Sequence, residues 1–202
     1  MNMSHLDKEM LLGQIKGKGY QLSSLDDLMH INKSHKDLLP ILLMHLDSVA
    51  DESDKQFLVR CLGVKGFDAA SKPLIREFYH AQNSSYKWAI GNSLALIADG
   101  SVFPDLLKIT QDKSHGTARQ MIVDSLWHYP CDETKAVLVS LLSDNDVAGH
   151  AIRAISKLQD PSLLEYVEPL QKHEVAWIRN AAKSATKKLK SMSHPSQNIG
   201  ES

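Results

Sequence analysis

Apolar residues recur along the chain with the period of an α-helix, most clearly in residues 146–161, DVAGHAIRAISKLQDP. The apolar positions of this stretch are Val147, Ala151, Ala154, Ile155 and Leu158. Residues three and four positions apart lie on the same side of a helix, so the pattern predicts an amphipathic helix with a face of small and branched side chains. Asp146 is expected to cap the start of this helix, and Asp160-Pro161 is expected to end it.

The same pattern occurs five times, which indicates an array of repeats. At spacings of 29 to 32 residues, the position of Ile155 is held by Leu62, Leu94, Leu126 and, with its apolar character lost, Thr186. The position of Ala151 is held in the other units by Leu58, Ile90, Ile122 and Ala182. Stacked helical units produce internal repeats of this kind, so we predict an all-α fold.

A second set of amphipathic segments alternates with these helices. It comprises residues 37–46, 69–79, 102–109, 133–142 and 162–171. Three of the segments carry an early proline: Pro40, Pro73 and Pro104. The first turn of a helix tolerates proline because the missing N–H has no partner within the helix there. Each unit is therefore expected to be a helix, a short turn, a second helix and a polar loop.

The second helices resemble those of the HEAT-like repeat family, in which V-R-x-x-A-A-x-A-L lies between an Asp and an Asp-Pro pair. Residues 146–161 and 178–182, IRNAA, match best. Through the runs KWAIGN (87–92) and HGTAR (115–119), the chain is also similar to stand-alone bacterial HEAT-repeat proteins, with repeats like those of the phycobilisome-lyase type. The resemblance implies a right-handed α-solenoid of about five two-helix repeats over residues 36–190.

The two ends of the chain do not fit the repeat. Residues 1–35 have apolar positions for two short helices around the GKGYQLSS turn, and we predict a helical cap there. Residues 191–202 are polar and contain Pro and Gly, so we predict a disordered tail. The lysines before this tail are expected to form a solvated capping face: Lys183, Lys187, Lys188 and Lys190.

Composition narrows the class of protein. Hydrophobic residues make up 43% of the chain and charged residues 23%, which is enough apolar material for a continuous core. The net charge is −1, so a nucleic-acid partner, which usually requires a basic excess, is not expected. No apolar run has the length of a signal peptide or membrane span, which predicts a cytoplasmic protein without membrane contact. Cys61 takes the repeat position of Ala154 and is expected in the core.

A basic residue recurs one position after the Val147 slot in four of the five units: Lys55, Lys87, Arg119 and Arg179. These residues could form a stripe for an anionic partner, or a ladder of ion pairs between repeats. Possible acceptors in the same loops are Asp51, Asp54, Asp112 and Asp144. The repeat spacing and the nearby acidic residues favour the ladder, whose exposed pairs would each contribute only ~0–1 kcal/mol.

The side of the second helices opposite the apolar face is the predicted binding surface, because in HEAT-like arrays these helices line the concave side. The predicted contact residues are Gln56, Arg60, Trp88, Asn92, Gln120, Asp124 and Arg153. Trp88 is the most informative, since exposed tryptophans are common at binding hot spots, although it could also be partly buried against the next helix. We therefore expect a monomeric scaffold, without catalysis or a cofactor of its own, that binds a protein or peptide.

The alternative is an enzyme or enzyme subunit of HEAT-like type, either a chromophore-lyase subunit or a DNA glycosylase. Trp88, Asp124 and Arg153 are similar in residue type, but not in spacing, to the groups in the groove of HEAT-like glycosylases. The ten histidines show no metal-ligand spacing, and His115 in the SHGTAR turn is the one to examine. No hydrolase, NTPase or dinucleotide motif is present, so no catalytic or metal-binding residue is assigned.

Overall fold

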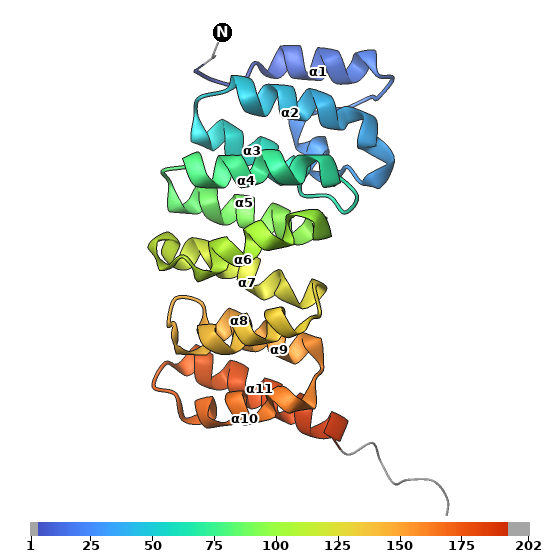
Figure 1. The fold of residues 1–202 in the computed structure, drawn as a ribbon. Helices are drawn as coiled ribbons and strands as arrows, with labels where there is room; N and C mark the ends of the chain where they lie inside the picture. The colour runs from blue at the N-terminus through green and yellow to red at the C-terminus, as the bar shows by residue number, and fades with distance from the viewer. Residues whose placement is uncertain (1–3, 194–202) are drawn as a thin grey trace, which may run out of the picture. The chain divides into compact units, whose positions relative to one another are not determined.

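The computed structural model describes residues 4–193, which form helices and turns without a β-strand (Figure 1). The α-helices are α1 (Lys8–Gly17), α2 (Leu39–Ser48), α3 (Glu52–Leu62), α4 (Ser71–His80), α5 (Ser84–Ile97), α6 (Phe103–Gln111), α7 (Gln120–Ser125), α8 (Asp132–Ser140), α9 (Ala148–Leu158), α10 (Leu164–Val167) and α11 (Ala176–Ser193). The 3₁₀ helices are η1 (Leu25–His30), η2 (Lys33–Leu38), η3 (Asp68–Ala70), η4 (Gly100–Val102), η5 (Lys113–Arg119), η6 (Leu126–His128), η7 (Leu141–Ser143), η8 (Pro161–Leu163) and η9 (Glu168–Lys172). Within this described part, none of the helices combines the length and the apolar character needed to cross a membrane.

The chain divides into two compact units. Unit 1 consists of Met1–Ile109 and Thr117–Ile122, and unit 2 consists of Thr110–Gly116 and Val123–Ser202. In unit 1, α2 packs on α3, while α3 and α4 both pack on α5; in unit 2, α8 packs on α9, and α9 and α10 both pack on α11. The second helices of successive repeats, α3 with α5 and α9 with α11, therefore lie side by side within their own unit (Figure 1).

Side-chain caps and prolines determine where the helices begin. Asp51 accepts hydrogen bonds from two N–H groups in the first turn of α3, and Asn83 does the same for α5. The first N–H groups of a helix have no partner within the helix, so such side chains fix its start. The predicted early prolines all lie in the first turn of a helix: Pro40 in α2, Pro73 in α4 and Pro104 in α6.

The start of α9 differs from the prediction. Asp146 does not cap the helix, which begins at Ala148; instead, the carbonyl of Asp144 accepts the hydrogen bond from the Ala148 N–H at 2.7 Å. The Asp144 carboxylate accepts another from the N–H of Asp146 itself, at 3.1 Å. The helix ends at Leu158; the next residue, Gln159, has a left-handed φ of 59°, and Asp160 caps the 3₁₀ helix that follows.

The repeated apolar positions form the core of both units, as predicted. The position aligned with Ile155 is at most 4% exposed in every unit: Leu62, Leu94, Leu126, Ile155 and Thr186. The position aligned with Ala151 is fully buried in every unit: Leu58, Ile90, Ile122, Ala151 and Ala182. Removal of apolar surface from water is the main stabilising contribution to folding, so this shared face defines the packing of the second helices. Thr186 is buried with them because it occupies the same face of α11.

The N-terminal segment contains the two predicted helical elements, but the second is a 3₁₀ helix rather than an α-helix. Between α1 and η1, Gly19 has a φ of 90°, a conformation that glycine adopts without steric cost. The two elements bury Leu11, Ile15 and Leu28. At the other end, α11 continues to Ser193, into the segment predicted as a tail from residue 191. The rest of that segment, 194–202, lies outside the described residues.

The second helix of the third repeat is broken into three pieces. The repeat pattern predicted one second helix containing Ile122 and Leu126, whereas the structure has η5, the short α7 and η6 in succession. Within η5, Gly116 has φ 51° and ψ −135°, which is not a helical conformation. The boundary between the two units also falls here, after Ile122.

Candidate functional site

The predicted binding residues are divided between the two units. Unit 1 contains Gln56, Arg60, Trp88, Asn92 and Gln120. Unit 2 contains Asp124 and Arg153. Each group is therefore described within its own unit.

Three of the predicted residues, Gln56, Arg60 and Trp88, line one pocket of about 410 Å³ in unit 1. Gln56 and Arg60 belong to α3 and Trp88 belongs to α5, and these two helices pack side by side. Trp88 is 36% exposed and Arg60 is exposed, so both can contact a partner without prior rearrangement. We call this hollow the Trp88 pocket.

The rest of the Trp88 pocket consists of hydroxyl-bearing residues that sequence analysis missed: Ser84, Ser85 and Thr117. The two serines follow the cap residue Asn83 directly, and this helix-start signal could have placed them at the surface near Trp88. Thr117 precedes α7 in the chain, and only the folded structure brings it to the pocket. Asn92 and Gln120 are half-buried and do not line the pocket.

Two carboxylates hold the helices around the Trp88 pocket in place. Glu52 accepts hydrogen bonds at 2.8 and 3.1 Å from the N–H groups of the two residues that precede α5, which connects the starts of α3 and α5. Glu77 of α4 accepts hydrogen bonds from the Lys55 Nζ, at 2.9 and 3.0 Å, and from the Tyr86 hydroxyl, at 2.9 Å. Burial and the nearby Glu77 carboxylate raise the pKa of Tyr86, so its hydroxyl remains a donor.

The expected ladder of ion pairs does not use the predicted acceptors around Lys55. Lys55 pairs with Glu77 on α4, the first helix of the next repeat, because its long side chain reaches past the acidic residues of its own loop. Asp51 instead caps α3, and Asp54 accepts a hydrogen bond from a backbone N–H of the N-terminal segment at 3.0 Å. Arg179 donates to two backbone carbonyl groups just before α11, at 2.7 and 3.0 Å.

The Trp88 pocket offers groups for binding but none for nucleophilic catalysis. Its lining supplies an indole, a guanidinium, an amide and three hydroxyl groups. A serine or threonine nucleophile requires a neighbouring general base, and the lining contains no His, Asp, Glu or Lys. Among residues 4–193, no carboxylate forms a salt bridge with Arg60, so its guanidinium can donate to an incoming acceptor. The arrangement suits a planar or apolar group against Trp88 and a hydrogen-bond acceptor beside Arg60.

In unit 2, Asp124 is buried, which contradicts the prediction that it faces outward; its exposed fraction is 6%. Arg153 Nε lies 3.3 Å from Oδ1 of Asp124, and Lys157 Nζ lies 2.9 Å from Oδ2. Both cations extend from α9, and Lys157 Nζ also lies 5.5 Å from the centre of the Trp127 ring. The outward position that helical spacing predicted for Asp124 is therefore wrong, and its carboxylate pairs with cations of the next repeat.

The paired state of Asp124 bears on the glycosylase alternative. A general base must have a lone pair within reach of the substrate proton. Both oxygens of Asp124 are within 3.4 Å of cationic nitrogen atoms of Arg153 or Lys157. The structure thus brings Asp124 and Arg153 together as an ion pair, whereas Trp88 belongs to the other unit.

A tryptophan of α11 lies across α9 in unit 2. Gly149 makes this possible, since a Cβ at that position would overlap the Trp177 ring. The ring centroids of Trp177 and His150 are 5.1 Å apart, with an edge-on angle of 66°, and Trp177 remains 42% exposed. Burial lowers the pKa of His150, with the Asp124 carboxylate opposing and the two cations of α9 reinforcing the shift, so the neutral imidazole is favoured.

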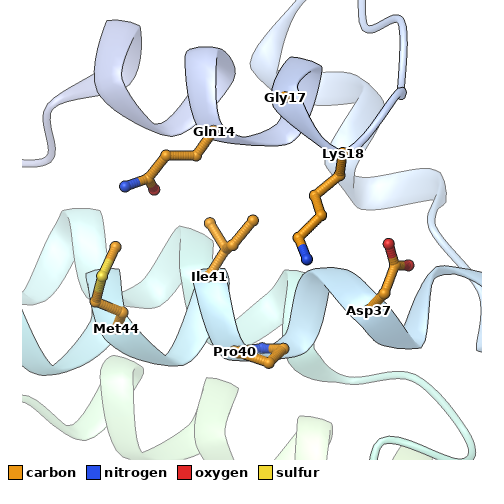
Figure 2. Close-up of a pocket in the computed structure, with 7 residues that line it drawn as sticks. All are labelled: Gln14, Gly17, Lys18, Asp37, Pro40, Ile41 and Met44. Carbon is orange, nitrogen blue, oxygen red and sulfur yellow. The ribbon is translucent and has the colours of Figure 1, made fainter.

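Unit 1 has a further hollow that sequence analysis did not predict, between α1 and α2 (Figure 2). Its volume is about 460 Å³, and its lining residues are Gln14, Gly17, Lys18, Asp37, Pro40, Ile41 and Met44. Figure 2 shows Gln14 of α1 and Lys18, the residue after α1, extending toward α2, from which Met44 extends in the opposite direction. Gly17 leaves space in the wall because it has no side chain. This hollow lies beside α2, which is the first helix of a repeat, whereas binding was predicted on the second helices.

One group of side chains in unit 1 could hold a metal ion. Ligand atoms of His5, Asp51 and Asp54 all lie within 4.8 Å of one another. His5 is far in sequence from Asp51 and Asp54, so spacing rules could not reveal the group. Both carboxylates already accept backbone hydrogen bonds and therefore have a structural role. His115, the histidine singled out in the sequence, lies with its Nε2 3.5 Å from Oδ2 of Asp112.

Comparison with known proteins identifies the repeat. Residues 103–187 match the family model of HEAT repeats. The matched stretch runs from α6 into α11, and it includes α9 and residues 178–182 of α11, the segments that best matched the resemblance in sequence. A search of the curated proteins finds no match to the chain.

Proposed function

Because this chain contains HEAT repeats, we propose that it is a binding scaffold that holds a protein or peptide on its second helices and performs no catalysis itself. The architecture that goes with this proposal is a monomeric, right-handed superhelix of five repeats. Repeats of this kind provide an extended surface, and their function depends on the residues displayed on it.

The observation that carries the proposal is the Trp88 pocket. A partly exposed indole and an exposed arginine, which has no salt bridge to the described residues, share one hollow. Tryptophan and arginine are enriched at binding hot spots. The carboxylates of Glu52 and Glu77 fix the helices that present them, so little conformational freedom would be lost on binding. We expect the partner to place an apolar or aromatic side chain on Trp88 and an acceptor, such as a backbone carbonyl, beside Arg60.

The test begins with a partner captured by the tagged protein from a lysate of its own organism and then purified. Trp88→Ala and Arg60→Ala should each weaken its binding by at least ~1–2 kcal/mol, because hot-spot side chains lose this much or more on truncation. Isothermal titration calorimetry measures the dissociation constants, and circular dichroism melts show that the variants are folded.

Matched controls are available on α4, the first helix of the same repeat. Arg76 and Tyr79 are exposed there, so Arg76→Ala and Tyr79→Ala should leave affinity unchanged within about twofold. Glu77→Ala is unsuitable as a control because its carboxylate holds Lys55 and Tyr86. If the α4 variants lose the partner while the pocket variants keep it, the binding surface is on the first helices. A metal or nucleotide recovered in stoichiometric amount from the purified protein would overturn the non-catalytic role.

A further inference from the structure

Positive charge is concentrated on the two second helices of unit 2. Neither α9 nor α11 contains an aspartate or glutamate. Their basic residues are Arg153 and Lys157 on α9, and Arg179, Lys183, Lys187, Lys188 and Lys190 on α11. Up to residue 193, the acidic residues of unit 2 lie on α7, α8, α10, the 3₁₀ helices and the loops. This separation of charge is absent from the composition as a whole, where the net charge is −1.

The two basic helices form one surface, because α9 and α11 pack against each other within unit 2 (Figure 1). Trp177 of α11 crosses the α9 backbone at Gly149, and its ring reaches His150. The side chains of Arg153 and Trp177 remain half exposed on this surface, which therefore combines cations with an aromatic ring.

Some of these cations are already paired within the protein. Lys190 pairs with Glu168 of η9, and Arg179 donates to backbone carbonyls. Arg153 and Lys157 share the single carboxylate of Asp124, which leaves an excess of positive charge between them. Lys183, Lys187 and Lys188 are exposed, and within residues 4–193 none of the three forms a salt bridge. The exposure of these three lysines agrees with the predicted solvated face, and their charge is available to a ligand.

We infer that this basic face, defined as Arg153, Lys157, Lys183, Lys187 and Lys188 together with Trp177, binds an acidic segment of the partner protein. The inference rests on the proposed scaffold function and gives the chemical class of the partner on unit 2. Carboxylates of an extended segment can pair with the lysines, while an apolar side chain between them can contact Trp177. Complementary charge of this kind also speeds association and selects against basic partners.

A protein segment fits this face better than a nucleic acid does. Strong attachment to a phosphate backbone relies on many cations, with about 6–10 phosphate contacts in proteins whose affinity depends strongly on salt. Here only three exposed lysines are without a salt bridge, two further cations share Asp124, and the whole chain is slightly acidic. A few carboxylates spaced along a peptide match that number.

Asp124 acts within this face as an internal competitor. Its carboxylate occupies Arg153 and Lys157, so an incoming carboxylate must share or displace it. Asp124→Asn keeps the size of the side chain but removes its charge, which makes both cations available to the ligand. The variant should therefore bind an acidic segment more tightly than the natural protein does.

The experiment measures fluorescence anisotropy of a fluorescein-labelled peptide of about twelve residues, with alternating Glu and Ser and one central Phe. At ~50 mM salt, the full chain should bind this peptide and should not bind the same peptide with Gln in place of Glu. Lys183→Gln, Lys187→Gln and Lys188→Gln combined should weaken binding about tenfold, the product of three modest exposed contacts. Asp124→Asn should strengthen it about threefold.

Lys135→Gln is the matched control, because this lysine lies on α8, off the basic face, where it pairs with Asp160. Its affinity for the acidic peptide should stay within about twofold of that of the natural chain. Circular dichroism melts confirm that each variant is folded, and Asp124→Asn remains informative because a merely damaged protein would not bind more tightly.

Several results would overturn the inference: no binding of the Glu peptide, equal binding of the Gln peptide, or a combined lysine variant that binds as tightly as the natural chain. Tighter binding of a labelled oligothymidylate of about twelve nucleotides than of the peptide would assign the face to nucleic acid instead. These outcomes leave the Trp88 pocket test unaffected, since Trp88 and Arg60 belong to unit 1. If the pocket variants bind the captured partner normally, that result in turn does not test whether the basic face binds the acidic peptide.

Discussion

The same repeat position is occupied by large side chains in unit 1 and by alanine in unit 2. Leu58, Ile90 and Ile122 hold it in unit 1, and Ala151 and Ala182 hold it in unit 2; all are fully buried. Close packing leaves few voids in protein interiors, so neighbouring groups must come closer to the alanines than to the larger residues. The repeat therefore preserves which face is buried, while the volume that fills it changes from one unit to the other.

The two glycines on these helices show the same contrast. In unit 1, the Cβ of an alanine at Gly91 would lie 3.2 Å from Cγ1 of Ile122, so this glycine makes room for a core side chain. In unit 2, Gly149 makes room for Trp177, a side chain that is still 42% exposed. Gly91 thus allows a core side chain to pack closely, whereas Gly149 allows a partly exposed side chain to do so.

The exposed faces of the second helices differ even more than the cores. In unit 1, Trp88 and Arg60 share a small polar pocket, whereas in unit 2 cations gather around Asp124 and along α11. Exposed positions of a repeat are free to vary because they contribute little to packing. The binding chemistry must therefore be read separately for each unit.

The largest effect is expected from removing volume in unit 1. Ile90→Ala should lower the free energy of unfolding by about 2–5 kcal/mol, because it removes a fully buried side chain and leaves a cavity. Urea denaturation followed by circular dichroism measures the loss. Leu96→Ala on the same helix is the control, and it should be close to neutral since Leu96 is 52% exposed. A loss below about 1 kcal/mol for Ile90→Ala would mean that this position is not packed as described.

Adding volume at the equivalent position of unit 2 should also destabilise the fold, by a smaller amount. Ala151→Leu should cost about 1–3 kcal/mol, because a fully buried alanine leaves no space for three more carbon atoms. Melting curves of the two forms give the shift of the midpoint. Ala176→Leu adds the same group at an exposed position of α11 and should have little effect. An unchanged midpoint for Ala151→Leu would contradict the assignment of the buried face.

The buried face of the second helices could be predicted from the sequence because it depends on one regular feature, the helical period. Leu62 and Leu94 are buried for this reason, and so is Thr186, whose polar character the alignment could not explain. The period also placed Trp88 and Arg60 on the exposed side, where the structure joins them in one pocket.

What the sequence could not provide depends on the reach of side chains from neighbouring elements. Asp124 was expected to face outward, but it is buried and pairs with Arg153 and Lys157 of the next repeat. Lys55 reaches Glu77 on another helix instead of the acidic residues of its own loop. Contacts of this kind depend on the distance between helices, which the spacing of apolar residues does not specify.

The smallest effect expected is a dependence of stability on pH that arises from one histidine in each unit. Burial lowers the pKa of His45, with Asp7 opposing, and burial also lowers the pKa of His150, where Asp124 opposes and Arg153 and Lys157 reinforce the shift. Each of these two histidines is therefore protonated less readily in the folded protein than in the unfolded chain. Stability should be independent of these groups above the ordinary histidine pKa of about 6.5, and should fall as the pH drops below it toward the lowered folded values.

Urea unfolding at about pH 7.5, 6.5 and 5.5 would measure the contribution of each histidine to this slope. His45→Gln should make stability depend less on pH, because the variant removes a histidine that is protonated less readily in the folded state. The variant also alters the 2.8 Å hydrogen bond between His45 Nε2 and Gln14. His150→Gln should flatten the slope for unit 2, and there the edge-on contact with Trp177 provides a second readout, a change of indole fluorescence with pH. His30→Gln at an exposed position serves as the control and should leave the slope unchanged. The contrary result is a free energy of unfolding that changes between about pH 6.5 and 5.5 by the same amount in the natural chain and in His150→Gln. That result would mean that the imidazole takes up its proton as readily in the folded unit as in the unfolded chain, and that the cations of the basic face do not act on it.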